Sequence, residues 1–358
     1  MKSRVYFVPA SYDEDDKTLA EKVSKLVKMS GIVEGIAKDD YVGIKLHFGE
    51  KDNIGFIRPS LAAVVGDLCK ERSQNCAFLE TNTIYIGSRS NTISHLNLAH
   101  SHGFTYANTG LPIVIADGIT GRDHVNLKID KKHIKEAKIA SGIIDFDYIV
   151  SMAHVTGHCQ TGLAASIKNI GMGCASRAGK LEQHSTVLPE ITKEKCLGCG
   201  LCIKWCPKDA IKLVKKKAVI SKEECIGCGE CTVACRVGAI EIKWNESIHN
   251  LQEKMAEYAY AALKDRRKGF MNFAMHITKD CDCMAKDEPT ITRDLGILAS
   301  LDPVALDKAT MDLLIKDAEC DRLRDAKDGY PNIDWNIQLE YSAKLGLGNL
   351  DYELITVD

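Results

Sequence analysis

Apolar residues recur along the first half of the chain in two alternating patterns. Short runs rich in β-branched residues predict strands, and longer runs with apolar residues three and four positions apart predict helices. The predicted strands are residues 4–8, 41–48, 77–80, 113–116 and 148–152. The predicted helices are residues 18–29, 59–70 and 93–100, and residues 118–140 are expected to form a hairpin. This alternation is typical of an α/β domain with a largely parallel sheet.

The pattern changes between residues 189 and 245, where Cys, Gly and Lys dominate; we call this stretch the cysteine-rich segment. The α/β pattern then returns, with a predicted helix at 251–264 and strands at 270–277 and 295–300. A further helix is expected to begin at Asp302-Pro303, because Asp caps a helix and Pro suits its first turn.

The simplest domain organisation is one α/β host domain with an insertion. Residues 1–188 and 246–358 form the two parts of the host, and residues 189–245 form a small inserted α+β module. The alternative is three independent domains. We prefer the insertion because the strands predicted between residues 270 and 300 are too few to form a stable sheet alone.

Composition excludes several classes of protein. Hydrophobic residues at 45% and charged residues at 27% are typical of a globular chain. The formal net charge of -2 gives no reason to expect nucleic acid as a partner, and no apolar run approaches the length of a membrane span. The fifteen cysteines are odd in number and clustered, which argues against a secreted disulfide scaffold. We therefore expect a reducing, cytoplasmic location.

Eight of these cysteines form two copies of the motif Cys-x2-Cys-x2-Cys-x3-Cys, within the related stretches that begin ITKEKCLGCG and ISKEECIGCG. Three thiolates from one such loop hold one iron–sulfur cube, and the fourth reaches the other cube. The spacing therefore predicts two 4Fe-4S clusters. The first would be held by Cys196, Cys199, Cys202 and Cys235, and the second by Cys225, Cys228, Cys231 and Cys206.

With all eight ligands and four loop glycines present, the segment resembles the bacterial ferredoxin with two 4Fe-4S clusters. It departs from that pattern once, because Arg236 stands where the second motif usually has Pro. Proline is not a ligand, so this change does not affect the predicted clusters. A pair of four-coordinate zinc sites is the alternative, but the duplicated run ending in Cys-Pro is a poor zinc pattern. Lys215–Lys217 is either a rim that docks on the acidic host or a solvated turn.

Polar residues follow several predicted strands of the host. Lys45, His47 and Glu50 close the second strand, and His158 follows the strand at 148–152. A predicted helix beyond it carries Lys168 and Asn169. Because ligands of parallel α/β sheets bind beyond the carboxyl ends of the strands, we expect a polar site there.

The segments GIKLHFGE, ETNTIYIGSR, TGLAASIKNIGMGC, KDCDC and DLGILASLDPVALDKA resemble the iron–sulfur family called domain-of-unknown-function 362. The resemblance covers nearly the whole chain and implies an α/β host with an inserted ferredoxin module, but no established reaction. The motifs of that family fall on Lys45, His47, Glu50, His158, Lys168, Asn169, Cys281 and Cys283. These are our candidate site residues.

Each candidate also has a structural explanation. His47 and His158 are equally well explained as hydrogen-bonded structural histidines, Lys168-Asn169 as a helix brace, and Asp302 as a helix cap. Cys281 and Cys283 form a third metal site only if Cys159, Cys174 or His276 lies beside them, because two thiols do not close a site.

Three functions fit these observations. The first is an oxidoreductase in which the clusters relay single electrons to a small-molecule substrate at the host site, with His47 or His158 moving protons and Lys45 or Lys168 holding an anionic group. The second is an electron-transfer or adaptor subunit whose partner is a redox protein. The third is a metal- or cluster-handling factor that uses Cys281 and Cys283. We rank the enzyme first, because tethering an electron carrier raises its effective concentration at its partner.

Overall fold

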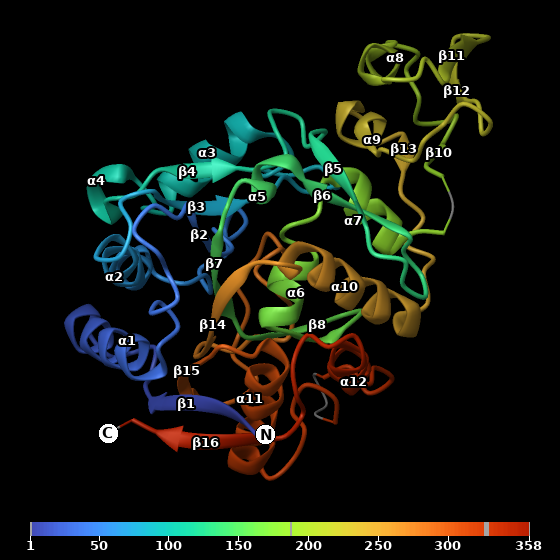
Figure 1. The fold of residues 1–358 in the computed structure, drawn as a ribbon. Helices are drawn as coiled ribbons and strands as arrows, with labels where there is room; N and C mark the ends of the chain where they lie inside the picture. The colour runs from blue at the N-terminus through green and yellow to red at the C-terminus, as the bar shows by residue number, and fades with distance from the viewer. Residues whose placement is uncertain (1, 187, 326–328, 358) are drawn as a thin grey trace.

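The computed structural model describes residues 2–186, 188–325 and 329–357. Within them, eight strands form a central sheet in the order β16-β1-β15-β14-β7-β2-β3-β4 (Figure 1). Only β15 runs antiparallel to its neighbours, so five of the seven strand pairs are parallel. The strands are β1 (Ser3–Pro9), β2 (Val42–Lys45), β3 (Cys76–Glu80), β4 (Ile113–Ile115), β7 (Tyr148–His154), β14 (Arg267–Ala274), β15 (Gly296–Ser300) and β16 (Tyr352–Thr356). The predicted α/β class with a largely parallel sheet is confirmed.

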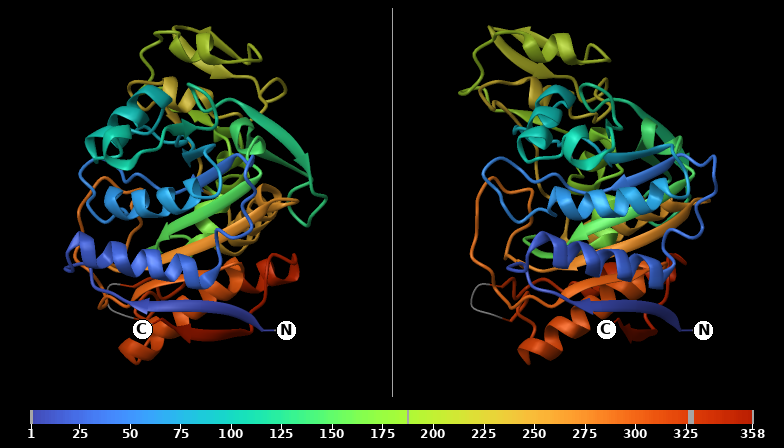
Figure 2. Two further views of the ribbon diagram at one scale, coloured as in Figure 1. Left: turned by 60° about the vertical axis from the view of Figure 1, so that its left-hand side comes forward. Right: turned by 90° about the vertical axis from the view of Figure 1, so that its left-hand side faces the viewer.

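Helices cover both faces of this sheet (Figures 1 and 2). One face packs against α1 (Asp16–Ser30), α2 (Pro59–Lys70) and α3 (Thr92–Ser101). The other packs against α6 (Ser166–Gly171), α10 (Ile248–Leu263), α11 (Pro303–Ala318) and α12 (Asn336–Lys344). Each face has its own apolar core, because successive side chains of a strand point to opposite sides. In the described residues, no helix is long and apolar enough to cross a membrane.

Helix α1 illustrates how the sequence specifies these elements. Its buried residues Leu19, Val23 and Leu26 recur at helical spacing and face the sheet. The Asp15 side chain accepts a hydrogen bond from the Thr18 amide and caps the first turn. Gly31 ends the helix in the left-handed conformation, with φ of 70°. The predicted helix at 18–29 is therefore confirmed, with slightly wider bounds.

The second predicted strand was too long. Alternating Ile44, Leu46 and Phe48 suggested a strand over residues 41–48, but β2 ends at Lys45. Leu46 and Phe48 remain fully buried in the same core as Ile44, although their backbone has left the strand. The alternation of apolar residues therefore predicts which side chains are buried on one face, but it does not predict where the strand ends.

The predicted cap of α11 and the predicted hairpin are both confirmed. Asp302 accepts hydrogen bonds from the amides of Val304 and Ala305. The hairpin consists of β5 (His124–Lys128) and β6 (Glu136–Ala140). The sequence did not predict β16, α12, or the short elements α4 (Tyr106–Thr109), α5 (Ser141–Ile144), α7 (Arg177–His184), β8 (Thr156–His158) and β9 (Gly162–Ala164).

The cysteine-rich segment lies at one end of the molecule (Figure 1, upper right). Its ends pair as β10 (Glu190–Ile191) and β13 (Ile240–Glu241). Between them lie α8 (Leu201–Trp205), the hairpin of β11 (Ile211–Val214) and β12 (Lys217–Ile220), and α9 (Glu230–Ala234). Of Lys215–Lys217, the first two are exposed in the turn of this hairpin, and Lys217 donates to the Cys196 carbonyl at 2.7 Å, so this stretch is a turn of the segment and does not contact the described part of the host.

Candidate functional site

The cysteines of the two motifs lie close together in space, although they are up to 39 residues apart in sequence (Cys196 to Cys235). Burial raises the pKa of the Cys202 thiol, and the nearby thiols of Cys235, Cys196 and Cys199 raise it further. These are the four cysteines predicted to share the first cluster. The fourth, Cys235, thus approaches the first motif from the second.

The other four cysteines line one hollow. Cys206, Cys225, Cys228 and Cys231 border about 350 Å³ of space that is partly open to solvent. Cys206 comes from the first motif and the other three come from the second, which is the crossed arrangement predicted from the spacing. All eight thiols are free of disulfide bonds.

Backbone amides point at three of the sulfur atoms. The amides of Ala218, Ala210 and Ala239 donate hydrogen bonds to the Sγ atoms of Cys196, Cys206 and Cys235, at 3.4, 3.3 and 3.1 Å. Each motif contains two glycines in the left-handed conformation, with φ between 65° and 73°, which turn the loop tightly around its thiols. Amide donors to sulfur are a feature that stabilises bound iron–sulfur clusters and tunes their potentials. The residues present therefore fit such a cluster.

Helix α9 of the cysteine-rich segment contacts the host through a buried charge. The carboxylate of Glu230 lies 3.6 Å from Arg177 Nη1 and 3.3 Å from Arg122 Nε. Glu230 and Arg177 are both almost completely buried. At this contact an acidic residue of the segment meets arginines of the host, which is the opposite of a basic rim that docks on an acidic host.

A second contact joins α9 to the loop that follows β3. The Thr232 hydroxyl, next to Cys231, lies 2.6 Å from the Gly229 carbonyl and 3.2 Å from the Ile84 carbonyl, so its one proton is shared between these two acceptors. The adjacent Tyr85 hydroxyl donates to the carbonyl of Cys283 at 3.1 Å. A short chain of bonds therefore leads from a predicted cluster ligand to the Cys-x-Cys pair of the host.

The carboxyl ends of β2 and β3 are joined by a buried ion pair. Lys45 Nζ donates to Glu80 Oε1 at 2.7 Å and to Asn169 Oδ1 at 3.0 Å. The Asn169 amide in turn donates to Ser151 Oγ on β7. Lys45 and Asn169, both predicted site residues, are thus brought together, and their hydrogen bonds fix three strands and α6 relative to one another.

Glu50 also forms a buried ion pair. Its carboxylate accepts from Arg89 Nε at 3.1 Å, and both side chains are buried. Arg89 donates to the Tyr85 hydroxyl at 2.6 Å. Glu50 therefore positions the Arg89–Tyr85 pair, and through it the loop that meets α9.

His47 and His158 share one local arrangement. His47 Nδ1 accepts from the Gly49 amide at 2.9 Å, and His158 Nδ1 accepts from the amides of Gln160 and Thr161 at 3.2 and 3.1 Å. An Nδ1 that accepts leaves the proton of the neutral ring on Nε2. Burial lowers the pKa of both histidines well below the usual range, with Lys168 among the nearby cations. Both are therefore neutral Nε2–H donors.

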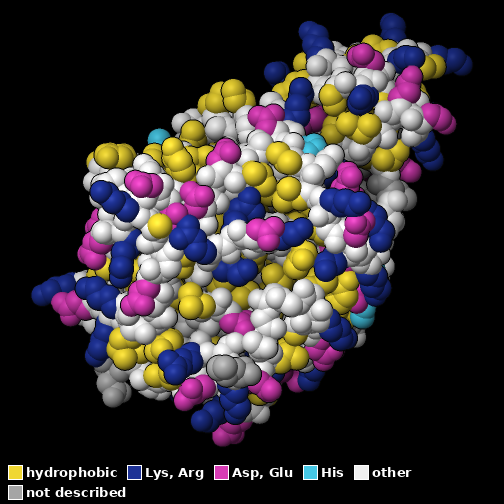
Figure 3. All heavy atoms as spheres, in the orientation of Figure 1, with side chains coloured by type: hydrophobic (Ala, Val, Ile, Leu, Met, Phe, Trp, Pro, Cys, Tyr) yellow, Lys and Arg dark blue, Asp and Glu magenta, His cyan; other side chains and the backbone are white. Residues whose placement is uncertain are grey.

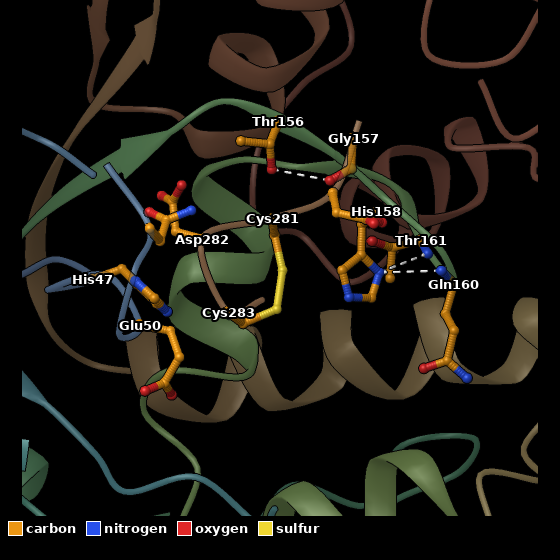
Figure 4. Close-up of a disulfide and its surroundings, with 12 residues drawn as sticks. His47, Glu50, Thr156, Gly157, His158, Gln160, Thr161, Cys281, Asp282 and Cys283 are labelled. Atoms are coloured by element: carbon orange, nitrogen blue, oxygen red, sulfur yellow. Dashed lines mark hydrogen bonds between the residues drawn. A yellow bond between two sulfur atoms is a disulfide. The ribbon is translucent and has the colours of Figure 1, made fainter. Parts of the chain in front are cut away.

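His158 meets the predicted Cys-x-Cys pair. A ring nitrogen of His158 and the Sγ atoms of Cys281 and Cys283 lie within 4.8 Å of one another. The two cysteines are joined by a disulfide, and the rings of His158 and His47 point toward it in Figure 4. The anticipated neighbours of the pair were Cys159, Cys174 and His276, whereas the group that forms contains His158.

Two further groups complete this edge of the sheet. Burial lowers the pKa of Lys168 to about 8, with Cys159 and Asp282 opposing the change. The Asp282 carboxylate contacts His154 Nδ1 at 2.9 Å, and His154 Nε2 contacts the Met275 carbonyl at 2.8 Å. The predicted residues Lys168 and His158 therefore share the edge with a His–Asp pair.

Sequence reasoning missed several of these residues. Glu80 was recognisable as a polar residue at the end of the third predicted strand, but Tyr85 and Arg89 lie in the stretch ETNTIYIGSR and were noted only through its family resemblance. Glu230 and Arg177 were missed because a lone charge gives no signal in a sequence; their significance is burial, which only the fold reveals.

The fold and the site define a mixed α/β protein with a cysteine-rich segment beside the carboxyl edge of its sheet. A family model described as a domain of unknown function, DUF362, matches residues 42–312, so the chain belongs to this family. No curated protein matches the sequence.

Two solved structures are similar to the chain at low identity. A crystal structure of a protein from Thermotoga maritima is 11% identical, with a TM-score of 0.45, over 86% of this chain and 59% of that one. The lactate racemase apoprotein from Thermoanaerobacterium thermosaccharolyticum is 13% identical, with a TM-score of 0.38, over 77% of this chain and 51% of that one. The chain thus spans less than two thirds of either structure.

Proposed function

We propose that this protein is an iron–sulfur oxidoreductase, in which two 4Fe-4S clusters in a ferredoxin-like segment serve a reaction at the carboxyl edge of the host sheet. When bound, the clusters supply or accept single electrons. The first set of ligands is Cys196, Cys199, Cys202 and Cys235, and the second is Cys206, Cys225, Cys228 and Cys231.

The observation that carries this proposal is the crossed grouping of the eight thiols. Four cysteines around one hollow, three from one motif and one from the other, form the ligand set that a two-cluster segment requires. Zinc would be satisfied by the same number of thiols. The amide donors to Cys196, Cys206 and Cys235 suit metal-bound thiolates in general, whereas the run of three cysteines at Cys-x2-Cys-x2-Cys spacing favours clusters over zinc.

The position of α9 supports a role for the host. The ligand set of Cys206, Cys225, Cys228 and Cys231 is the one whose helix contacts the host, through Glu230 and Thr232. The loop that receives this contact begins at the carboxyl end of β3 and carries Tyr85 to the Cys-x-Cys pair. An adaptor subunit has no need of an internal route from its cluster segment to a polar edge.

The residues at this edge suit a small anionic substrate. Lys168 is available to hold an anionic group, and its pKa of about 8 leaves it mainly charged at neutral pH. His47 and His158 present Nε2–H groups that donate hydrogen bonds to an oxygen or sulfur that gains charge. Lys45 and Glu50 are held in ion pairs, so we assign them a positioning role.

The proposal is tested by metal analysis of the full chain, purified without oxygen. We expect about eight irons and eight acid-labile sulfides per chain, and an electron paramagnetic resonance spectrum of two interacting reduced clusters. Substitution Cys231→Ser lowers the iron content, whereas Cys69→Ser, at a buried cysteine in the core of the host, leaves it unchanged. Two zinc ions per chain without sulfide would overturn the proposal.

A further inference from the structure

The Cys281–Cys283 pair lies in a setting suited to redox chemistry of the sulfurs themselves. The two sulfur atoms are bonded to each other, and a ring nitrogen of His158 lies within 4.8 Å of both. Cys281 and His158 are buried, and Cys283 is partly exposed.

The hydrogen bonds of His158 determine which of its ring nitrogens carries the proton. Two backbone amides, those of Gln160 and Thr161, point at Nδ1. Nδ1 is therefore without a proton, and Nε2 carries one. Nε2 lies on the side of the ring that faces the disulfide (Figure 4). An N–H donor therefore lies near the two sulfur atoms.

The same hydrogen bonds disfavour a metal ion at this position. A histidine that binds metal through Nε2 carries its proton on Nδ1 and donates it to a carbonyl or carboxylate. Here Nδ1 faces two donors, so a metal would force N–H groups against each other. Three ligands would also leave a tetrahedral site one short.

We propose that Cys281 and Cys283 form a redox-active dithiol/disulfide couple, with His158 stabilising its reduced form. On reduction, the S–S bond breaks and the two sulfurs take up two electrons. One sulfur takes a proton from solvent and becomes a thiol, and the other remains a thiolate that accepts a hydrogen bond from His158 Nε2. The inference rests on the proposed function for the source of the electrons: two one-electron carriers supply the two that the bond requires.

Tyr85 connects this couple to the cysteine-rich segment. Its hydroxyl donates to the carbonyl of Cys283, and the neighbouring carbonyl of Ile84 accepts from Thr232, which follows the predicted ligand Cys231. Arg89 and Glu50 hold the Tyr85 hydroxyl in place. This gives the candidate residue Glu50 a role in orienting the connection between the two sites.

The redox state of Cys281 and Cys283 is measured by mapping the free thiols of the whole chain, handled without oxygen. Trypsin cuts after Lys279 and Lys286, and the peptide between them contains Cys281 and Cys283 but no other cysteine. The protein is equilibrated in a series of reduced and oxidised dithiothreitol, alkylated with N-ethylmaleimide and analysed by mass spectrometry. We expect this peptide to change from disulfide to doubly alkylated in one two-electron transition.

Variants of His158 test whether this residue stabilises the reduced form of the couple. His158→Phe removes the donor and shifts the equilibrium toward the disulfide by about tenfold or more, whereas His158→Gln keeps an N–H donor and shifts it less. Free thiols in every buffer would overturn the couple. So would one zinc per chain that is lost in the Cys281→Ser/Cys283→Ser variant, because it would establish a metal site instead.

The source of the electrons is tested separately with reduced methyl viologen, a one-electron donor. Cys231→Ser is expected to slow reduction of the peptide by this donor but not its equilibrium in dithiothreitol. Equal rates in the variant and the parent would overturn the link to the clusters and leave the couple standing. If the purified protein contains no iron but the peptide with Cys281 and Cys283 still changes between disulfide and dithiol, the proposed function fails and the redox couple stands.

Discussion

Glu230 of the cysteine-rich segment and Arg177 of the host form an ion pair from which water is excluded. Their charged groups lie 3.6 Å apart, and both side chains are almost completely buried. Burial raises the pKa of Glu230, and the guanidinium groups of Arg177 and Arg122 oppose that rise by stabilising the charged carboxylate. The attachment of the segment is thus sensitive to either residue.

Substituting Glu230→Gln is expected to destabilise this attachment by about 2 kcal/mol, because it removes the carboxylate that faces the buried charge of Arg177. Denaturant unfolding and limited proteolysis of the segment measure the loss. Glu241→Gln, at an exposed ion pair with Lys195, is the matched control and is expected to have little effect. Equal stability of the two variants would contradict a structural role for the buried pair.

Lys45→Met is expected to cost about 3–5 kcal/mol, because Glu80 would be left as an unpaired buried charge. The double variant Lys45→Met/Glu80→Gln removes both charges and is expected to lose much less than the two single variants together. A double-mutant cycle in urea measures this difference. Additive losses would mean that the two side chains act independently.

Asp302 joins three parts of the chain. Besides capping α11, its carboxylate accepts from Ser3 Oγ at 2.6 Å and from the Asn349 amide at 2.8 Å. Asp302→Ala is therefore expected to cost about 2–3 kcal/mol, more than a helix cap alone. Thermal unfolding compares this loss of stability with that of Asp15→Ala, which removes an exposed cap of α1 and is expected to cost less. The reverse order would show that the contacts to Ser3 and Asn349 contribute nothing.

His184 should make the protein sensitive to acid. Burial lowers its pKa to about 3, with Lys168, Lys180 and Lys254 adding to the effect. The unfolded chain binds this proton near pH 6.5, so between pH 6.5 and 3 the unfolded state holds more protons than the folded state. Stability is therefore lost as the pH falls through this range, by an amount on the order of 4 kcal/mol.

Replacing His184 with Gln is expected to flatten that dependence, as measured by urea unfolding at pH 7 and pH 4.5. His100→Gln, at an exposed position of α3, serves as the control and should retain the slope of the parent protein. An unchanged slope in His184→Gln would assign the acid sensitivity to other groups.

Much of the fold followed from the sequence because its elements carry local signals. The bounds predicted for α2 match the structure, since Pro59 marks its start and buried apolar residues follow at helical spacing. Strand β16 escaped prediction because Tyr352–Thr356 has only partly buried or exposed residues and lies at the edge of the sheet. An edge strand lacks the apolar run of a central one.

The candidate site was predictable only in part. Lys45 could be assigned to the end of a strand. The cluster ligands could be predicted because the spacing of their cysteines lies within one segment. The meeting of His158 with Cys281 and Cys283 joins residues more than a hundred positions apart, and no periodicity reports such a contact. The ionisation of His158 depends on amides in its own turn and on burial, which are properties of the folded chain.

The position of β1 has a consequence for how the chain folds during synthesis. This strand pairs only with β15 and β16, whose residues follow it by almost 300 positions or more. Strands β2 and β3, by contrast, are joined by a single helix and can pair soon after they leave the ribosome. We therefore expect β2, β3 and β4 to assemble early, while β1 remains unpaired until β15 and β16 have been synthesised. Val5 and Val8, which are buried in the folded protein, therefore stay uncovered in the nascent protein during that interval, which favours the binding of a chaperone to this strand.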